Sequence, residues 1–300
     1  MSCSQRNWAT VNPIPTSSPR FTCGTAAIGK NEEVAYDEAN TRARLLAAYD
    51  AQLRTDAETP GAITVARLGP LRLVTFSGGR GFITYRDLGE ANADAVQQLV
   101  PEALSYFQST PGIERVEWKT RAHDYAPGLH DALLANGFIP DEPESIMIGE
   151  AVALAIDVPL PLGVIVRRLT EEPDVRAMSA MQAEVFGDPI SVDEADALVQ
   201  RLSLADGLEL WVGEAEGQIV TAGRLEPVAS SDFAGIWGGA TRADWRGKGI
   251  YRAVTAARAR SAIARGKTLI HSDSTAYSRP ILERSGFITV STTTPYHWKR

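Results

Sequence analysis

The sequence predicts a two-part α/β protein in which each part is a mixed central sheet flanked by helices. Three observations lead to this prediction. Strand-like and helix-like segments alternate along most of the chain, a proline-containing break divides it near the middle, and the two halves share one order of elements. A length of 300 residues also suggests about two domains of roughly 150 residues each.

The first half is expected to hold a tail followed by a small α/β unit. Residues 1–36 are rich in Ser, Thr, Pro and Gly and lack periodicity, which predicts a disordered tail. In the unit expected over residues 37–158, Leu45, Tyr49 and Leu53 recur at helical spacing. The elements expected after this helix are strand-like runs at 63–76 and 82–85, a helix at 91–108, a strand at 116–120, a short helix at 127–136 and a strand at 145–148.

The second half is expected to form a unit over residues 164–300, after a strand end and linker at 151–163. Ser191 with Glu194 three residues later has the spacing of a capping box and announces a helix. The elements expected here are a strand at 164–168, helices at 173–185 and after 191, strands at 208–214, 218–225 and 234–241, a long helix at 249–265, a strand at 268–272, a short helix at 279–285 and a strand at 288–298.

One internal echo connects the two halves. The pairs Gly137-Phe138 and Gly286-Phe287 stand 149 positions apart, and each follows a short helix and precedes a strand. At the same offset Asp124 falls opposite Asp273. The matched order of elements indicates two copies of one α/β unit, too few for a solenoid.

Composition excludes several classes of protein. The net charge of −7 and pI near 5.3 argue against a nucleic-acid or anionic-membrane binder. The only cysteines, Cys3 and Cys23, lie in the tail, so the folded part is expected to lack disulfides and Cys-bound metal. The four histidines show no metal-ligand spacing, and no metal is expected. The sequence shows no apolar run typical of a signal peptide or a membrane-spanning helix. We therefore expect a cytoplasmic, bacterial protein.

The charge is unevenly distributed along the chain. Residues 1–160 hold 13 Lys/Arg against 20 Asp/Glu, whereas residues 161–300 hold 17 of each. Inside the neutral half, residues 242–267 carry eight basic side chains and one acid, Asp244. This basic stretch follows a predicted strand and covers the start of the long helix, so we expect its cationic side chains to cradle phosphates.

The segment Arg246-Gly247-Lys248-Gly249-Ile250-Tyr251-Arg252 has the chemistry of a phosphate cradle. A helix N-terminus presents unpaired backbone N–H groups and a positive dipole end, and Gly247 and Gly249 leave room for a phosphate to approach. A tight turn with solvated arginines is the alternative interpretation. Neither a P-loop nor a G-x-G-x-x-G fingerprint is present in the sequence.

This segment resembles the acyl-CoA pyrophosphate loop of the GNAT superfamily of N-acyltransferases, [RQ]-x-x-G-x-[GA]. Arg246, Gly249 and Tyr251 fall on the defined positions, and Tyr251 departs from the usual Gly or Ala. The resemblance implies a GNAT domain over 164–300 and a degenerate GNAT-like domain over 37–158 that lacks the loop. It implies acetyl-CoA as co-substrate, bound by Gly239, Ala240, Thr241, Arg246, Gly247, Lys248, Gly249, Ile250, Tyr251 and Arg252.

The resemblance also implies where the chemistry takes place. The co-substrate would lie between two splayed strands, 234–241 and 268–272, and an amine would attack the thioester directly. The position of the family's usual proton-donating tyrosine holds Leu282, so Tyr277, Ser278 or water would protonate the thiolate. Glu226, Asp232 and His271 are the candidate bases, with Glu226 preferred and His271 second. Loop-solvating carboxylates, a core histidine and a helix-capping tyrosine are the alternative readings of these residues.

The sequence thus predicts an N-acetyltransferase acting on a primary amine of a small, cationic molecule such as an amino acid, a polyamine or an antibiotic-like compound. Protein or peptide N-acetylation and a non-catalytic acyl-CoA-binding regulator are the alternatives. The N-terminal half would either pair two chains into a homodimer or form a wall of the acceptor site. We expect neither a nucleic acid nor a membrane as partner.

Overall fold

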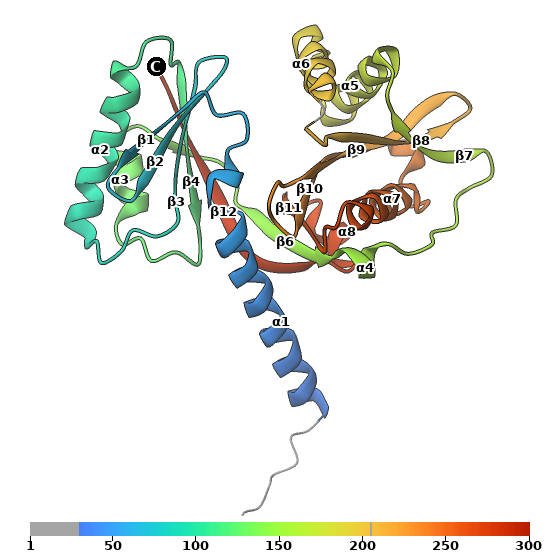
Figure 1. Cartoon of the computed structure of the whole chain (residues 1–300), viewed down its shortest axis with the longest axis horizontal. Helices are drawn as coiled ribbons and strands as arrows, with labels where there is room; N and C mark the ends of the chain where they lie inside the picture. The colour runs from blue at the N-terminus through green and yellow to red at the C-terminus, as the bar shows by residue number, and fades with distance from the viewer. Residues whose placement is uncertain (1–29, 205) are drawn as a thin grey trace, which may run out of the picture. The chain divides into compact units, whose positions relative to one another are not determined.

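The computed structural model describes residues 30–204 and 206–300 of the chain, coloured along the sequence in Figure 1. Most of the tail that was expected to be disordered, including Cys3 and Cys23, lies outside the described residues. The first helix, α1 (Lys30–Gln52), begins seven residues before the expected start of order at Asp37. Residues 40–300 form one compact unit.

The elements follow the predicted order with few exceptions. The first half contains α1, the 3₁₀ turn η1 (Asp56–Glu58), β1 (Thr64–Leu68), β2 (Leu71–Phe76), β3 (Arg80–Tyr85), α2 (Ala93–Ser109), β4 (Arg115–Arg121), α3 (Leu129–Ala135), β5 (Ile139–Pro140), β6 (Glu144–Glu150) and α4 (Ala151–Leu154). The second half contains β7 (Val164–Leu169), α5 (Glu172–Phe186), α6 (Val192–Ser203), β8 (Glu209–Ala215), β9 (Gln218–Pro227), β10 (Phe233–Thr241), η2 (Ala243–Trp245), α7 (Ile250–Ala264), β11 (Leu269–Ser274), α8 (Arg279–Glu283) and β12 (Ile288–Lys299).

Two local predictions differ from the structure, and one is confirmed. The run 63–76, expected as one strand, is an antiparallel hairpin of β1 and β2 that turns at Gly69, whose φ is +54°. The expected strand end after residue 150 is instead the short helix α4. The helix announced by Ser191 is α6, and the Ser191 hydroxyl accepts a hydrogen bond from the Glu194 backbone N–H at 3.2 Å.

All strands of the described chain join one mixed sheet, in the order β1-β2-β3-β4-β12-β6-β11-β10-β9-β8-β7, with β5 beside β12. The terminal strands of the two halves are exchanged in this sheet. Strand β12, red in Figure 1, runs antiparallel to β4 of the first half, while β6 runs antiparallel to β11 of the second half. Because β12 and β6 also pair with each other, the two sheets are continuous.

In each half, one hydrophobic core contains side chains from the other half of the sequence. In the first half, Tyr296 of β12 is buried with Trp118 and Phe138. In the second half, Met147 and Leu154 of the β6–α4 segment are buried among residues of α7, β10 and β11. Neither stretch of sequence therefore completes its own core.

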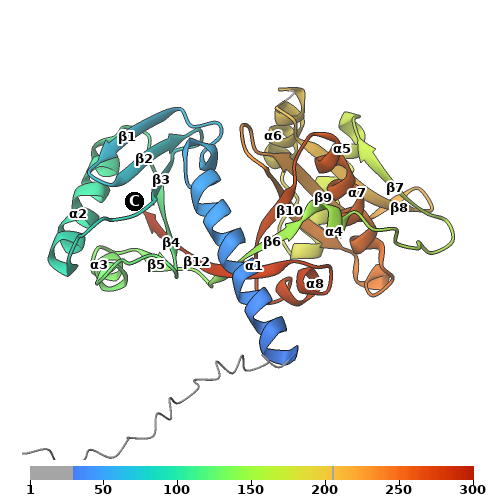
Figure 2. The ribbon, with the colours of Figure 1, turned by 60° about the horizontal axis from the view of Figure 1, so that its bottom comes forward.

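Helix α1 packs across the junction of the exchanged strands. Its apolar side chains Leu45 and Tyr49, and Leu53 directly after its end, are buried against Ile148 of β6 and Val290 of β12, among others. Figure 2 shows this helix crossing in front of β6 and β12. The helical spacing seen in the sequence is thus the face that covers the junction.

The internal echo corresponds to equivalent places in the two halves. Phe138 follows α3 and Phe287 follows α8, and both side chains are buried. The glycine before each has positive φ, +79° at Gly137 and +102° at Gly286, a conformation that L side chains rarely adopt. The matched order of elements in the sequence is therefore matched in space.

Replacement of Tyr296 by Ala is expected to destabilise the whole compact unit. The change removes a buried ring from the first core and the hydrogen-bonding partner of His130 Nδ1, 2.8 Å from the tyrosine hydroxyl. Aromatic-to-Ala changes in cores cost about 3–5 kcal/mol. Chemical denaturation followed by far-UV circular dichroism measures the loss.

The matched control is Tyr277→Ala, because the Tyr277 side chain is 71% exposed. It should change the free energy of unfolding by less than about 0.5 kcal/mol. Equal effects of the two substitutions would contradict the burial of β12 in the first core.

Candidate functional site

Strands β10 and β11 pair only at their beginnings. Parallel pairing joins Phe233 to Leu269, Ala234 to Ile270 and Gly235 to His271, and it ends there. On their outer edges, β10 continues alongside β9 and β11 alongside β6. A gap therefore opens in the sheet beyond Gly235 and His271, and both of its sides are held in place by other strands.

A bulge interrupts β10 on the same stretch. Trp237 is opposite Arg224 of β9, but Ala240 is opposite Ala222, so β10 has one residue more than its partner. Gly238 adopts a φ of +62° in the bulge, and its carbonyl accepts a hydrogen bond from the Gln182 amide of α5. The neighbouring Gly239 is exposed, so its backbone is accessible beside the gap.

The N-terminus of α7 has the features of an anion-binding site. Gly249 is its N-cap with a φ of +79°, and no side chain caps the helix. Gly247 has a φ of +73° and no atom near the position of a Cβ, so the approach to the loop is open. The first backbone N–H groups of the helix therefore have neither an intrahelical partner nor a capping side chain.

Tyr251 connects this helix to the bulge. A Cβ placed on Gly239 would lie 2.7 Å from the Tyr251 hydroxyl oxygen, so only glycine fits opposite this side chain. Tyr251 is partly buried against the core between α7 and β10. The departure from Gly or Ala at this position is thus accommodated by the glycine across from it.

The basic stretch 242–267 is only partly directed at the helix N-terminus, which corrects the expectation from the sequence. Arg246, Lys248 and Arg252 are at the loop and form no ion pair within the described part of the chain. Lys248 lies over the Trp245 ring, 4.5 Å from its centroid. The other five basic side chains are engaged elsewhere in the fold: Arg242, Arg258, Arg260, Arg265 and Lys267.

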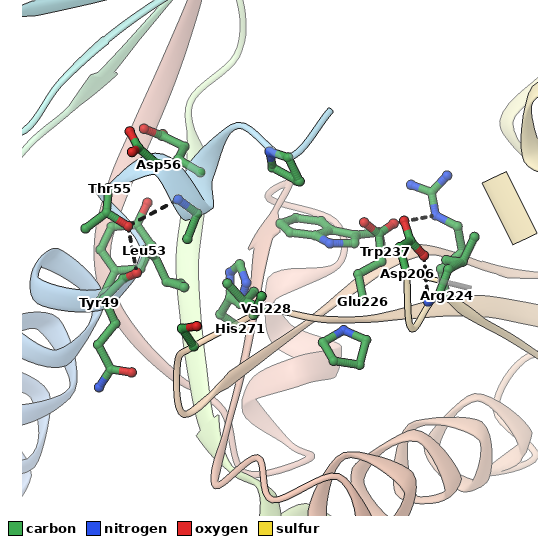
Figure 3. A pocket seen from close by; sticks show the side chains of 18 of the residues that line it. Tyr49, Leu53, Thr55, Asp56, Asp206, Arg224, Glu226, Val228, Trp237 and His271 are labelled. Carbon is green, nitrogen blue, oxygen red and sulfur yellow. Dashed lines mark hydrogen bonds and ion pairs between the residues drawn. The ribbon is translucent and has the colours of Figure 1, made fainter. Parts of the chain in front are cut away.

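A pocket of about 940 Å³ opens on the sheet beside the gap. Figure 3 shows side chains from the α1–η1 segment on one side, side chains from β9 and β10 on the other, and His271 between them. Trp237 and Asp273, each two residues beyond the last β10–β11 pair, also line it. The pocket therefore reaches the place where the two strands separate.

The two preferred base candidates lie on one row across the sheet. Glu226 of β9 is opposite Gly235 of β10, which is opposite His271 of β11. Paired residues share a face, so the two side chains stand on the same side about 10 Å apart at the backbone. The Trp237 indole covers the space above Gly235, where a Cβ would lie 2.5 Å from its Nε1, and packs edge-to-face on His271 at 5.3 Å.

Two arginines hold Glu226 in the pocket wall. Arg201 Nη2 donates to Glu226 Oε2 at 2.6 Å, and Arg224 Nε lies 3.4 Å from Oε1. The Glu226 side chain is 18% exposed and lines the pocket, while the ion pair with Arg201 fixes its orientation. Burial lowers the pKa of Arg224, and the neighbouring Arg201 contributes to this shift.

His271 and Asp273 follow each other on one face of β11. Burial lowers the pKa of His271 to about 4 although Asp273 acts in the opposite direction, so the imidazole is neutral at neutral pH. Burial alone would raise the pKa of Asp273, but the Lys119 ammonium, 2.7 Å from Oδ2, holds it below its usual range. A carboxylate and a neutral imidazole therefore stand side by side.

The first half of the sequence supplies part of this pocket, through residues that the sequence analysis did not name. Lys119 of β4 and Asp56 and Glu58 of η1 line it. Lys119 reaches Asp273 only because the exchanged strands join the two sheets. The sequence offered one usable signal, since Asp273 is two residues after His271 and so shares its strand face.

The remaining candidates lie outside the pocket. Tyr277 is exposed, and Ser278 shares a short-range hydrogen-bond network with Thr275 before α8. Leu282, at the position where the resemblance implied a tyrosine, is buried in the second core. Asp232 binds the Gln52 side chain at the surface.

Among residues 30–204 and 206–300, no group of three or more His, Cys, Asp or Glu side chains could hold a metal ion. No helix in the same part of the chain is both long and apolar enough to cross a membrane.

Comparison with known proteins finds likeness in structure. No protein-family model matches the sequence, and no curated protein matches it. The fold is similar to a GCN5-related N-acetyltransferase from Kribbella flavida, at 16% identity and a TM-score of 0.63, over 81% of this chain and 93% of that one. It is similar to a GCN5-related N-acetyltransferase from Sphaerobacter thermophilus, at 18% identity and a TM-score of 0.54, over 76% of each chain.

A third solved structure with a similar fold is a tandem protein. It is a tandem GNAT protein from the clavulanic acid biosynthesis pathway, at 10% identity and a TM-score of 0.54, over 76% of this chain and 78% of that one. The chain therefore has the GNAT fold, as the loop and the terminal Gly-Phe indicated. The predicted mixed α/β class with two GNAT-like parts is confirmed.

Replacement of His271 by Gln is expected to make the free energy of unfolding depend less on pH below neutral pH. The unfolded chain binds a proton at His271 near pH 6.5, whereas the folded chain does so only near pH 4. The stabilising effect of this group is thus complete above pH 6.5 and is lost as the pH falls toward 4. Between pH 7 and pH 4.5 the wild type should lose about 2–3 kcal/mol more than the variant.

Urea unfolding of both proteins at the two pH values measures this difference. His297→Gln is the matched control because that histidine is exposed at the surface. Parallel losses in wild type and His271→Gln would show that the ring takes up its proton normally in the folded state.

Proposed function

We propose that the protein transfers an acetyl group from acetyl-CoA to a primary amine of a small, cationic molecule bound in the pocket. The observation that carries this proposal is the gap between β10 and β11. On one side it leads to the glycine loop and uncapped N-terminus of α7, and on the other to the pocket that Glu226 and His271 line. Two substrates could thus meet from opposite sides of one opening.

The residues beside the gap fit the co-substrate. The uncapped N-terminus of α7, with Arg246, Lys248 and Arg252, would hold its pyrophosphate. The exposed backbone of Gly239 would pair with its pantetheine arm, which would continue past Thr241, with Tyr251 packed alongside. Acetyl-CoA supplies an activated acetyl thioester.

Glu226 is the base that the geometry favours. It lines the pocket on the row of Gly235 and His271, and Arg201 fixes its orientation. It would accept a proton from the substrate ammonium, directly or through a water molecule. His271, neutral and on the same row, is the second candidate. Tyr277 and Ser278 stay candidate proton donors to the leaving thiolate, as does water.

The N-terminal half would serve as a wall of the acceptor site and the unit over 164–300 as the acetyl-transferring half. Lys119 and the η1 segment supply that wall. The pocket is hollowed rather than a flat groove, which favours a small acceptor over a folded protein.

Charge reversal at the loop is expected to weaken CoA binding. Lys248→Glu places a carboxylate where the phosphates would bind, and with Arg246→Ala it removes two cations from the loop. The double variant should bind CoA at least about 100-fold more weakly, measured by isothermal titration calorimetry. Arg284→Glu makes the same charge change as Lys248→Glu at an exposed position at the end of α8 and should leave the affinity within about twofold. Unchanged affinity in the double variant would place the co-substrate elsewhere.

Replacement of Glu226 by Gln is expected to slow acetyl transfer by about 10²–10⁴-fold, because the general base is lost. Release of free thiol from acetyl-CoA with a panel of amines measures turnover, and CoA affinity should not change. Asp232→Asn, a carboxylate change outside the pocket, is the control. Loss of activity in His271→Gln but not in Glu226→Gln would reverse the assignment of the base.

CoA binding without turnover of any amine would favour a regulatory acyl-CoA-binding protein, for which buried Leu282 is the supporting observation.

A further inference from the structure

The pocket contains a buried carboxylate oxygen that has no hydrogen-bond donor within the described chain. Asp273 Oδ2 accepts from Lys119 Nζ at 2.7 Å, while Oδ1 is buried and has no partner. The Asp273 side chain is 9% exposed and lines the pocket at the edge of the β10–β11 gap. A buried polar atom left without a partner costs free energy, and a ligand that donates a hydrogen bond recovers it.

Asp273 is held in the charged form that attracts an ammonium group. Burial alone would raise its pKa, but the Lys119 ammonium outweighs this effect and lowers the pKa. Lys119 itself is engaged at Oδ2, so Oδ1 is the position available to a cationic donor.

A cationic side chain, Arg224 of β9, lines the same pocket. Within the part of the chain that the structure describes, the guanidinium of Arg224 donates no hydrogen bond, and its buried Nε has only an ion pair with Glu226 Oε1, at 3.4 Å. Its nearest carboxylate is Glu226, at 3.4 Å, and Glu226 accepts its short hydrogen bond from Arg201 instead. A guanidinium presents paired donors that match a carboxylate.

These two groups lie in one row across the sheet. Arg224 of β9 is opposite Trp237 of β10, and Asp273 is where β11 would be opposite Trp237 had the pairing continued. The Trp237 indole lies between them and lines the pocket. One small molecule above this ring could reach both.

We propose that the acceptor is zwitterionic: a small molecule whose amine binds Asp273 Oδ1 and whose carboxylate binds the Arg224 guanidinium. This inference rests on the proposed acetyl transfer and narrows its substrate class. Asp273 orients the amine at the gap. Glu226 stands two strands away on β9, beside Arg224, so it accepts the ammonium proton through a water molecule. Asp273 and Arg224 are thus binding residues for the two ends of the acceptor.

The other carboxylates of the pocket argue against a polyamine. Each already has a cationic partner: Asp56 with Arg72, Glu58 with Arg121, Asp206 and Glu226 with Arg201. Within the described residues, Asp273 Oδ1 is the only buried carboxylate oxygen of the pocket without a hydrogen-bond donor, so a second ammonium group would find no comparable buried site and would face Arg224.

The test compares amines that differ only in a carboxylate. Acetyl transfer is measured with lysine and cadaverine, with phenylalanine and phenethylamine, and with 4-aminobutyrate and propylamine. The carboxylate-bearing member of at least one pair should have a kcat/KM at least about tenfold higher. In Arg224→Gln this preference should fall to within about twofold, through KM rather than kcat, and Arg224→Lys should restore part of it.

Asp273→Asn should lower kcat/KM at least about tenfold for both members of a pair, because both carry the amine. Arg176→Gln, at the surface of α5 and outside the pocket, is the control and should retain the preference. Unchanged melting temperatures and CoA affinities in the variants exclude misfolding. Should Asp273→Asn fail this check, the Arg224 series alone decides.

The failure of this inference is distinguishable from that of the proposed function. If cadaverine and the other amines without a carboxylate have kcat/KM values equal to or higher than those of the amino acids, the acceptor is not zwitterionic. Acetyl transfer itself would still be supported. An equal loss for both members of a pair in Arg224→Gln would lead to the same two conclusions. The protein could instead bind an amino acid in calorimetry, lose this binding in Arg224→Gln and turn over no amine. This result would support the acceptor site and overturn the proposed acetyl transfer.

Discussion

The separation of β10 and β11 after three residue pairs is the constraint on which the rest of the site depends. Strands that part in the middle of a sheet leave backbone groups unpaired, and the fold tolerates this because each strand keeps its other neighbour. The bulge at Gly238 also shifts the register of β10 against β9 by one residue. The loop before α7, the accessible Gly239 backbone and the pocket all border this one opening.

The exchange of β6 and β12 determines what faces the opening. If each half had kept its own last strand, β4 would not be linked to β11 through β12 and β6. Lys119 reaches Asp273 through this arrangement, and α1 and η1 cover the junction beside the pocket. The half without a glycine loop is therefore part of the architecture of the site, and the two cores depend on each other.

The fold class was predictable because periodicity and turn chemistry are local. The long helix after the glycine loop, the capping box at Ser191 and the Gly-Phe echo all correspond to elements of the structure. The β1–β2 hairpin was missed because its turn at Gly69 is only two residues long within an apolar run. The basic stretch was over-interpreted, since proximity in sequence does not tell which way eight side chains point, either on α7 or in the segments before and after it. Arg258 is buried and Arg265 pairs with Glu209.

By itself the sequence determined the elements, the glycine-rich entry to α7 and two of the side chains that stand on one row, Glu226 and His271. Only the tertiary structure decided which strands neighbour each other, and hence that β12 and β6 change places. It also decided that Asp273 has Lys119 as partner and one oxygen without a donor, and that Arg224 lies beside Glu226 without a hydrogen bond. The physical reason is that strand pairing and charge pairing join residues more than a hundred positions apart, whereas the patterns in a sequence report on neighbours along the chain.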